Sequence, residues 1–187
     1  MKANFAIKLH KKDIAILEDI KFSLGVGKIY ISGNSVYYRV ESWNELQPII
    51  EHFDHYMLVT AKKVDYILFK ECFHIIKANE HLTEKGLLDV VKIKSSLNKG
   101  LSTDLESKFK VVKTERPEFK FEGIPDPFWV SGFTSGDGSF NIKTTTTPKN
   151  KIQLRYAVTL HNREVDVIKG LAEYILFFLY KKKRVNV

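Results

Sequence analysis

One short stretch of this chain occurs twice, and this internal repeat restricts the possible folds more than any other feature. Residues 5–23 align with residues 156–174 at an offset of 151, with three of 19 positions identical and eight more conservative. Each copy has the alternating pattern of a strand, followed by the pattern of an amphipathic helix. Repeats on this scale indicate repeated structural units, so we expect a two-repeat α+β protein.

A second stretch, residues 126–140, predicts a helix whose one face carries only small side chains. Asp126 can cap this helix, and Pro127 suits its first position because the missing N–H costs nothing there. The small residues of this helix share one face, at a spacing that allows another helix to approach its backbone closely. They are Ser131, Gly132, Ser135 and Gly136. We therefore expect this face to be a helix–helix interface.

The predicted helix ends in a carboxylate, Asp137, directly before a strand. Gly138 suits the left-handed position that stops a helix, and the pattern alternates from Ser139 onward. The partly negative end of a helix disfavours an isolated anion, so a cation is expected near Asp137, and a divalent ion such as Mg²⁺ prefers oxygen ligands. The alternative is that Asp137-Gly138 is only a tight turn.

Residues 129–140 resemble the signature of the LAGLIDADG homing endonucleases, with residues 130–138 filling its nine positions. The resemblance implies that the motif helices of two repeats pack together. It also implies that Asp137 binds Mg²⁺, or another divalent cation, for DNA cleavage, with the Gly136 carbonyl as a further ligand. Ser135 departs from the family pattern, because an acid is common at its position.

Lys62 lies in a Leu-x-Thr-x-Lys-x-x-Asp setting over residues 58–65, which resembles a catalytic-lysine setting of the same family. The resemblance implies that Lys62 stabilises charge at the scissile phosphate. By residue type alone, a lysine early in a helix is more commonly a solvated charge. Both interpretations remain open at this point.

The charge of the chain favours a polyanionic partner. The formal net charge is +8 and the isoelectric point is about 9.4, and lysines and arginines bind phosphates by releasing counterions. Only five of the 30 basic residues are arginine, a bias typical of A- and T-rich organellar or phage genomes. We expect an organelle-encoded mitochondrial protein, with a chloroplast or the cytoplasm of a phage host as alternatives.

Several features indicate a soluble protein in a reducing compartment. The single cysteine, Cys72, excludes an internal disulfide. The first residues lack the apolar stretch of a signal peptide, and the apolar run at residues 175–180 is too short to cross a bilayer. We expect no membrane partner.

Alternating segments predict the strands that would contact nucleic acid. These are Asn4–His10, a hairpin of Lys28–Ser32 and Ser35–Val40 about Gly33-Asn34, the strand from Ser139, and Lys151–His161. Basic, amide and aromatic groups on their polar faces suit phosphates and bases, whereas the alternative is an ordinary solvated face. The candidate DNA-binding residues are Lys8, His10, Lys28, Tyr30, Tyr37, Arg39, Ser139, Asn141, Lys143, Gln153, Arg155, Thr159 and His161.

Capping residues predict the helices of the first half of the chain. Asp13 begins a helix that ends at Gly25 or Gly27, and Ser42 with Glu45 forms a capping box. A further helix opens within residues 58–65, and Thr83 caps another that runs to about residue 97.

Prolines and a loss of periodicity mark a linker at residues 108–126. With the resemblance, this predicts two αββαββα-type LAGLIDADG repeats with antiparallel DNA-binding sheets. Residues 1–107 would be the remainder of a first repeat that lacks its start, and residues 127–187 the start of a second repeat, with its motif helix at 127–137. The missing first motif helix would come from a longer protein or from a second chain.

The expected function is site-specific DNA cleavage of the intron-homing type, by metal-dependent phosphodiester hydrolysis of double-stranded DNA. Because the family uses one acid from each motif helix, we expect this chain alone to be partial or inactive. An alternative is a non-catalytic nucleic-acid-binding protein on the same scaffold, such as a maturase that binds intron RNA. A basic α+β domain without a nucleic-acid role is the third possibility.

Overall fold

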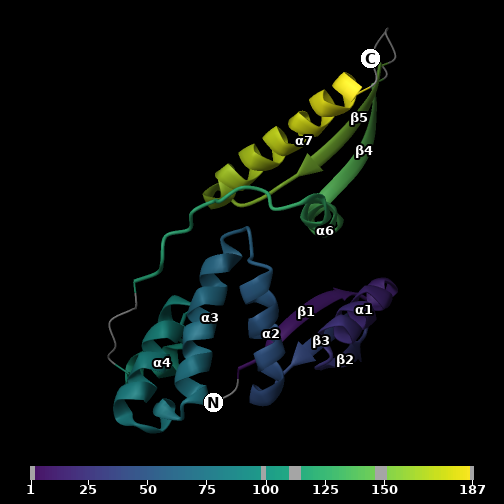
Figure 1. Ribbon diagram of the computed structural model, residues 1–187. Coiled ribbons are helices and arrows are strands. Elements are labelled where there is room, and N and C mark those ends of the chain that lie inside the picture. Colours follow the sequence, from purple (N-terminus) through teal and green to yellow (C-terminus); the bar gives the residue numbers. More distant parts are fainter. Residues whose placement is uncertain (1–2, 98–99, 110–114, 146–150, 186–187) are drawn as a thin grey trace. The chain divides into compact units, whose positions relative to one another are not determined.

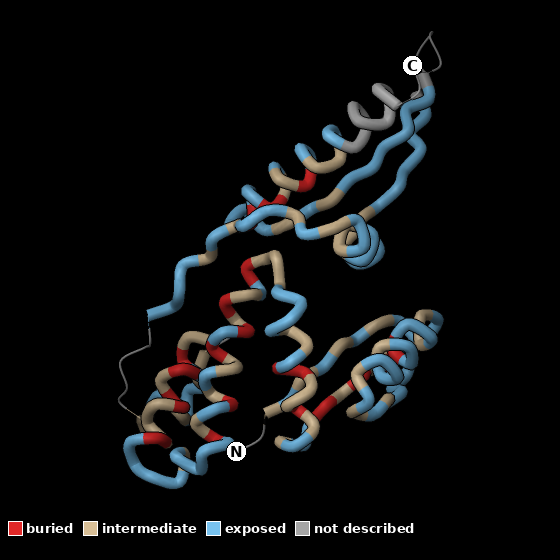
Figure 2. Tube along the Cα trace, viewed as in Figure 1, coloured by how far each residue is buried: buried red, intermediate tan, exposed pale blue. Residues whose placement is uncertain are grey.

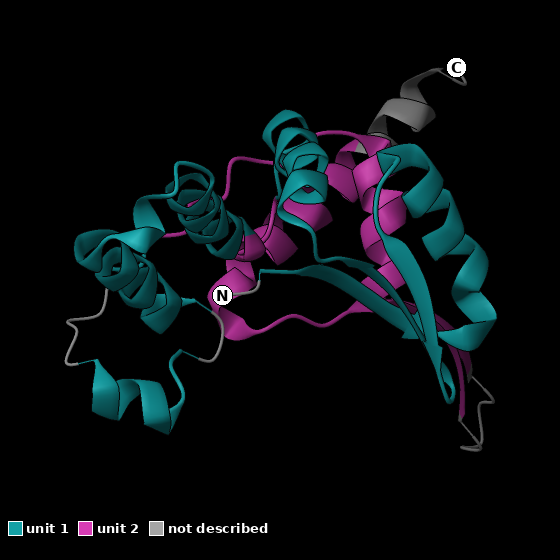
Figure 3. Cartoon of the chain, turned by 90° about the horizontal axis from the view of Figure 1, so that it is seen from below, with its two compact units in different colours: residues 1–58, 63–117 teal, residues 59–62, 118–187 magenta. Residues whose placement is uncertain are grey.

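The computed structural model describes residues 3–97, 100–109, 115–145 and 151–185, and the fold is α+β. The chain divides into two compact units (Figure 3). Unit 1 comprises residues 1–58 and 63–117, and unit 2 comprises residues 59–62 and 118–187. Each unit contains an antiparallel sheet, as the sequence predicts.

Unit 1 combines a three-stranded sheet with one helix between its first two strands and further helices after its last strand (Figure 1). The strand order is β1-β3-β2, and the β2–β3 hairpin turns at Gly33-Asn34 as predicted. Its elements are β1 (Phe5–His10), a 3₁₀ helix η1 (Lys11–Asp13), α1 (Ile14–Leu24), β2 (Lys28–Ser32), β3 (Ser35–Val40), α2 (Trp43–His55), α3 (Lys62–Lys77), η2 (Glu80–Leu82), α4 (Glu84–Ser96) and α5 (Thr103–Lys108).

The core of unit 1 lies on one face of this sheet. On β3, alternate side chains are completely buried (Figure 2), and they cluster with Leu17 of α1 and Leu46 of α2. The Tyr38 hydroxyl donates to the carbonyl of Val26 at 2.9 Å, so the one polar group on this face is paired. The opposite face remains available to carry polar side chains.

The helix boundaries of unit 1 follow the predicted caps only in part. Gly25 ends α1 at a φ of +70°, and the Thr83 hydroxyl accepts from the N–H of Gly86, as expected. Asp13 and Ser42 occupy N-cap positions, but neither side chain makes the predicted cap hydrogen bond. The 3₁₀ turn η1 begins the helical path three residues before α1, which explains why the Asp13 side chain makes no cap hydrogen bond.

Unit 2 contains one helix, a hairpin and a second helix in sequence, all after residue 126. The two strands pair over their full length, from Gly138↔Val158 to Thr145↔Lys151. The predicted strand Lys151–His161 is too long, because β5 ends at Val158. The elements are α6 (Pro127–Asp137), β4 (Gly138–Thr145), β5 (Lys151–Val158), η3 (Asn162–Glu164) and α7 (Val165–Val185). Residues 146–150, between the two strands, lie outside the described residues.

The two copies of the sequence repeat have the same local structure. In each copy a strand is followed by a 3₁₀ turn and then an α-helix. The Nδ1 atom of His10 accepts from the N–H of Lys12 at 3.2 Å, and Nδ1 of His161 accepts from the N–H of Arg163 at 3.3 Å. One strand–turn–helix unit thus occurs once in each compact unit.

The structure describes the predicted linker at residues 108–126 only in part. Residues 115–126 form neither helix nor strand, but Lys108 belongs to α5. Residues 110–114 lie outside the described residues. Within the described part of the chain, no helix combines the length and the apolar character needed to cross a bilayer.

Candidate functional site

Helix α6 begins as the sequence predicts. A carboxylate oxygen of Asp126 accepts from the N–H of Trp129 at 2.8 Å, and Pro127 occupies the first turn. The rings of Trp129 and Phe133 stack with centroids 4.6 Å apart. These local contacts fix where the helix starts.

The small-residue face of α6 is open within the described structure. Ser131, Gly132, Ser135 and Gly136 are all exposed. A Cβ atom added at Gly132 or Gly136 would meet nothing within 4 Å. The Ser135 hydroxyl donates to the Ser131 carbonyl at 2.9 Å, which turns this side chain along its own helix. The face is therefore smooth enough for close approach by another backbone.

Asp137 is the last residue of α6 and is exposed at the corner where β4 starts. The predicted left-handed conformation of Gly138 is wrong, because its φ of −85° and ψ of 153° are extended. Position 138 requires glycine for a different reason. A Cβ atom there would lie 2.5 Å from the Thr134 carbonyl oxygen, which accepts the Gly138 N–H. The chain thus passes from helix to strand without a loop.

The ligands at this corner fit a hydrated hard cation. Asp137 supplies one carboxylate and Gly136 a neighbouring backbone carbonyl, both on exposed residues. Among the described residues, no group of three or more His, Cys, Asp or Glu side chains gathers into a metal site. Mg²⁺ suits such a corner, because it keeps several waters and needs only one or two carboxylates beside substrate phosphates.

Lys62 is the first residue of α3 and is exposed. Its backbone N–H donates to the Thr60 hydroxyl at 3.3 Å, and the adjacent Ala61 is buried. The side chain thus projects from a helix start that local contacts hold. Lys62 and Asp137 lie on different elements, α3 and α6.

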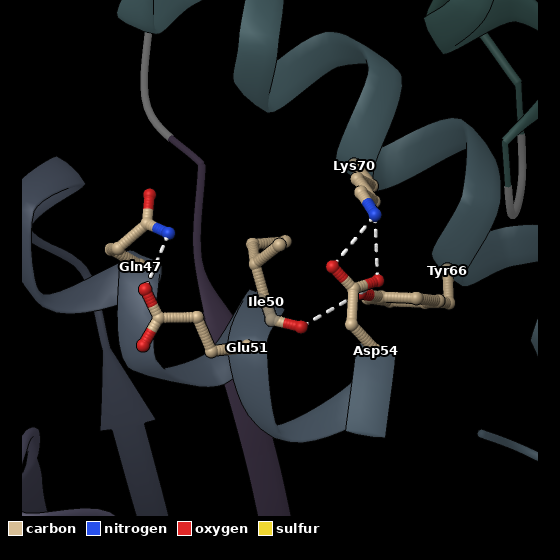
Figure 4. A network of polar contacts seen from close by, with 6 residues as sticks. All are labelled: Gln47, Ile50, Glu51, Asp54, Tyr66 and Lys70. Atoms are coloured by element: carbon tan, nitrogen blue, oxygen red, sulfur yellow. Dashed lines mark hydrogen bonds and ion pairs between the residues drawn. The ribbon is translucent and has the colours of Figure 1, made fainter. Parts of the chain in front are cut away.

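A polar network that we did not predict ties the end of α2 to α3 (Figure 4). The Lys70 ammonium donates to both carboxylate oxygens of Asp54 at 2.7 Å. The Tyr66 hydroxyl shares its proton between Asp54 Oδ1 at 2.6 Å and the Ile50 carbonyl at 2.8 Å. Because Tyr66 lies one turn beyond Lys62, this network fixes the helix that carries the candidate lysine.

The same network changes the acidity of its members. The hydrogen bond from Lys70, and then that from Tyr66, holds the pKa of the Asp54 carboxyl below its usual range. Burial, and then the Asp54 carboxylate, raises the pKa of Tyr66. At neutral pH the network is therefore an ionised carboxylate held by an ammonium and a neutral phenol.

The polar face of the unit 1 sheet brings five of the predicted DNA-binding residues together. Lys8 and Tyr30 each stand opposite Tyr37, and Lys28 stands opposite Arg39. The Arg39 guanidinium lies 4.9 Å from the Tyr37 ring centre and 5.5 Å from that of Tyr30, and Lys8 Nζ lies 5.4 Å from Tyr37. These cation–π contacts hold the cations above a wet sheet face.

In unit 2 the predicted polar residues also share one face. Asn141 stands opposite Arg155, and Lys143 opposite Gln153. Arg155 donates twice to the Gln153 side chain, at 2.9 and 3.1 Å, and Asn141 donates to the Ser139 hydroxyl at 3.2 Å. The face is exposed and carries amide, hydroxyl and guanidinium groups suited to base edges and phosphates.

Of the remaining predicted DNA-binding residues, two lie beyond the end of a strand and one is the last residue of a strand. Thr159 follows the end of β5, so its assignment to the polar face of that strand is wrong. His10 ends β1, and His161 follows β5. Both imidazoles cap 3₁₀ turns through Nδ1, which leaves only Nε2 for other partners.

Comparison with known proteins identifies the family. The sequence model described as LAGLIDADG endonuclease matches residues 1–73 and 130–187 of this chain. The chain belongs to the LAGLIDADG endonuclease family. The predicted resemblance is thereby confirmed.

Solved LAGLIDADG structures have the same fold. The meganuclease I-CpaMI, solved bound to uncleaved DNA, is 48% identical with a TM-score of 0.87, covering 92% of this chain and 61% of that one. I-SmaMI, solved bound to an uncleaved DNA target in the presence of calcium ions, is 40% identical with a TM-score of 0.88 over 92% of this chain and 62% of that one.

Curated relatives are intron-encoded proteins of longer chain length. The probable intron-encoded endonuclease 3 of Neurospora crassa is 33% identical over 91% of this chain and 33% of its own length. The probable intron-encoded endonuclease Cox1-I1b of Schizosaccharomyces pombe is 35% identical over 86% of this chain and 38% of its own length. The chain therefore spans between a third and two-fifths of these relatives.

Proposed function

We propose that this protein acts in site-specific cleavage of double-stranded DNA, as an intron-encoded homing endonuclease. The observation that carries the proposal is the exposed carboxylate of Asp137, held at the junction of α6 and β4. The adjoining β4–β5 hairpin presents a polar face that begins two residues later, at Ser139. A reactive carboxylate and a nucleic-acid-binding strand are thus continuous in the chain.

Asp137 and the Gly136 carbonyl would hold Mg²⁺, or another divalent cation, at this corner. When bound, such an ion supplies charge stabilisation and an activated water for phosphodiester hydrolysis. The calcium present in the I-SmaMI structure supports a divalent ion for this chain. Lys62, at the start of α3, would stabilise charge at the scissile phosphate.

The two polar sheet faces would bind the DNA. On unit 1, Lys8, Lys28 and Arg39 would contact phosphates, with Tyr30 and Tyr37 beside them. On unit 2, Ser139, Asn141, Lys143, Gln153 and Arg155 would reach base edges in the major groove. The DNA bound in the I-CpaMI structure supports DNA as the partner of this chain.

The domain assignment follows from the same reasoning. Residues 1–107 would belong to a first LAGLIDADG repeat, residues 108–126 would link the repeats, and residues 127–187 would belong to the second. The open face of α6 would receive a second motif helix, from a longer protein or from a second chain. The acid of that helix would complete a pair with Asp137, so the monomer alone would bind DNA without cutting both strands.

The compartment would be the mitochondrion. The relative Cox1-I1b is intron-encoded, and the lysine-rich, arginine-poor composition of this chain suits an A- and T-rich organellar genome. A direct check is the location of the coding sequence in mitochondrial or nuclear DNA.

Cleavage of selected DNA tests the proposed activity. DNA sequences retained by the protein from a randomised library are incubated with the protein and Mg²⁺, in comparison with Asp137→Asn. Asp137→Asn should retain DNA binding and lose all metal-dependent strand cleavage, since only the metal-binding oxygen is altered. Equal cutting by Asp137→Asn, or robust double-strand cutting by a monomer of wild-type protein, would contradict the proposal.

Light scattering tests the open α6 face. A dimer of this chain that dissociates on Gly132→Leu would support pairing of two motif helices. The substitution meets no atom of its own chain within 4 Å at the Cβ position, so it should leave the monomer folded. A dimer that Gly132→Leu leaves intact would place the interface elsewhere.

The exposed tyrosines favour a second candidate function, an RNA maturase without nuclease activity. Tyr30 is 41% exposed beside Arg39, and such rings can stack on unpaired bases. Asp137→Asn separates the two functions, because it should abolish DNA cleavage but leave assistance of intron splicing unchanged.

A further inference from the structure

Unit 1 contains a cavity that the proposed DNA chemistry does not use. Its volume is about 450 Å³, and its walls come from α3, α4, the segment around α5 and the first residues of the chain. This volume falls within the range of roughly 300–1,000 Å³ that is typical of small-molecule sites. It is about three times the size of engineered apolar cavities, of about 150 Å³, that already bind benzene.

The walls of the cavity are apolar and well supported. Phe73 and Ile93 are only 2% exposed, and Val90 of the same wall is 3% exposed. Among the described residues that line the cavity, only Asn4 and Lys94 carry an amide or a charged side chain, and both are exposed. A water molecule needs two to four polar partners, so the interior suits hydrocarbon better than water.

Lys94 is the charged residue among those that line the cavity, and it is exposed. Within the described part of the chain, its ammonium group has no hydrogen-bond or ion-pair partner. The amide of Asn4 is a second polar group at the cavity. An apolar cavity with an exposed cation among its lining residues is complementary to a molecule with a hydrocarbon body and one anionic end.

Cys72, the single cysteine of the chain, also lines this cavity. Burial, and then the neighbouring Glu71, raises the pKa of its thiol to about 11. The thiol is therefore protonated at neutral pH and forms part of the apolar wall. Chemical labelling of this thiol can also report whether a molecule occupies the cavity.

We propose that this cavity is a binding site for a small amphipathic carboxylate. The hydrocarbon body lies among the α3 and α4 side chains, and the carboxylate lies at the ammonium of Lys94. The site is independent of Asp137 and of any DNA-cleaving activity.

Calorimetric titration with laurate, below its micelle concentration, tests the site on the full chain. Laurate should bind saturably with one molecule per chain. Dodecanol, of equal length without the charge, should bind about two- to five-fold more weakly, the ratio expected for one exposed ion pair. Lys94→Gln should remove the preference for laurate, whereas Lys85→Gln, on the same helix but away from the cavity, should retain it.

Two further measurements locate the bound molecule. Leu105→Trp adds volume at a half-buried lining position and should reduce laurate affinity at least ten-fold. In the wild-type protein, laurate should slow labelling of Cys72 by an apolar maleimide, a measurement that needs no variant to fold. Absence of saturable binding, labelling that laurate does not slow, or loss of the laurate preference in Lys85→Gln would overturn the proposal.

Discussion

The two copies of the strand–turn–helix unit share a local structure but bury different side chains. In the first copy, Leu17 of α1 is fully buried and Ile16 is 50% exposed. At the equivalent positions of the second copy, Ile168 is half-buried and Val167 is fully buried. The same sequence pattern therefore specifies the helix, while the surrounding elements determine which face is covered.

Different neighbours explain this difference. In unit 1, Leu17 packs against β3 and α2 through the cluster that contains Val36 and Leu46. In unit 2, the ring of Phe121 lies so close to Gly170 that an added Cβ atom would stand 2.3 Å from it. The segment before α6 thus lies beside α7, and within the described residues α1 has no such neighbour.

The sheets differ in the same way. The apolar face of β3 is buried, whereas Phe140, Ile142, Ile152 and Leu154 of the β4–β5 hairpin are between 72% and 78% exposed within the described structure. A two-stranded hairpin is marginal by itself. Unit 1 should therefore supply most of the free energy of unfolding of this chain.

The largest expected effect is at Leu17. Leu17→Ala should lower the free energy of unfolding of unit 1 by about 2–5 kcal/mol, because it leaves a cavity in a packed core. The matched change Ile168→Ala should cost less, because that side chain is only half-buried. Hydrogen exchange of α1 and α7 amides measures the two effects separately. Equal losses would show that the repeat, and not its neighbours, sets the burial.

At the preceding position of each helix, Ile16 in α1 and Val167 in α7, we expect the larger loss of stability in unit 2. Val167→Ala should destabilise unit 2 by about 1–3 kcal/mol, because it removes buried methyl groups. Ile16→Ala should change the stability of unit 1 by less than about 1 kcal/mol, since half of that side chain already contacts water. Denaturant unfolding followed in the same two helices checks this, and a larger loss for Ile16→Ala would refute the assignment of faces.

The two histidine caps should contribute equally. His10→Ala and His161→Ala each remove one side-chain acceptor from a backbone N–H, at a cost of about 1 kcal/mol. Asn at either position should restore most of the loss, because its side-chain oxygen can accept the same hydrogen bond. Unequal losses would show that the copies differ locally and not only in their neighbours.

The smallest expected effect concerns the network at Asp54, which only unit 1 contains. Because its folded-state pKa is lowered, the Asp54 carboxylate stabilises unit 1 above its unfolded-state pKa, and this contribution disappears as the pH falls through the folded-state value. Asp54→Asn should cost less than about 1 kcal/mol at pH 7, because the pair is partly exposed, and almost nothing once the pH lies below the folded-state pKa. A difference that grows toward acid pH would contradict the assignment.

Features that depend on local contacts could be predicted from the sequence. The Asp126 cap with Pro127, the Gly33-Asn34 turn and the period change after Asp137 each involve residues close in the chain. The strand–helix repeat was also visible, because it depends on periodicity alone. The position of Asp137 at a helix-to-strand corner followed from these signals.

Other features depend on residues far apart in sequence or on exact backbone paths. The Asp54–Tyr66 and Asp54–Lys70 contacts join residues 12 and 16 positions apart on two helices. Gly138 was assigned to the wrong conformation because a glycine after a helix commonly adopts the left-handed conformation, whereas its close approach to Thr134 needs coordinates. The predicted strand ending at His161 was too long because the sequence alternation continues past the end of β5, up to the residue before the 3₁₀ turn.

The most direct test of the account is whether Asp137 binds a divalent cation. Mn²⁺, a paramagnetic substitute for Mg²⁺, should selectively broaden the backbone amide NMR signals of residues 136–139. Asp137→Asn should abolish that broadening, and excess Mg²⁺ should reverse it in the wild type. Broadening that persists in Asp137→Asn, or that centres on another acidic residue, would contradict the central claim.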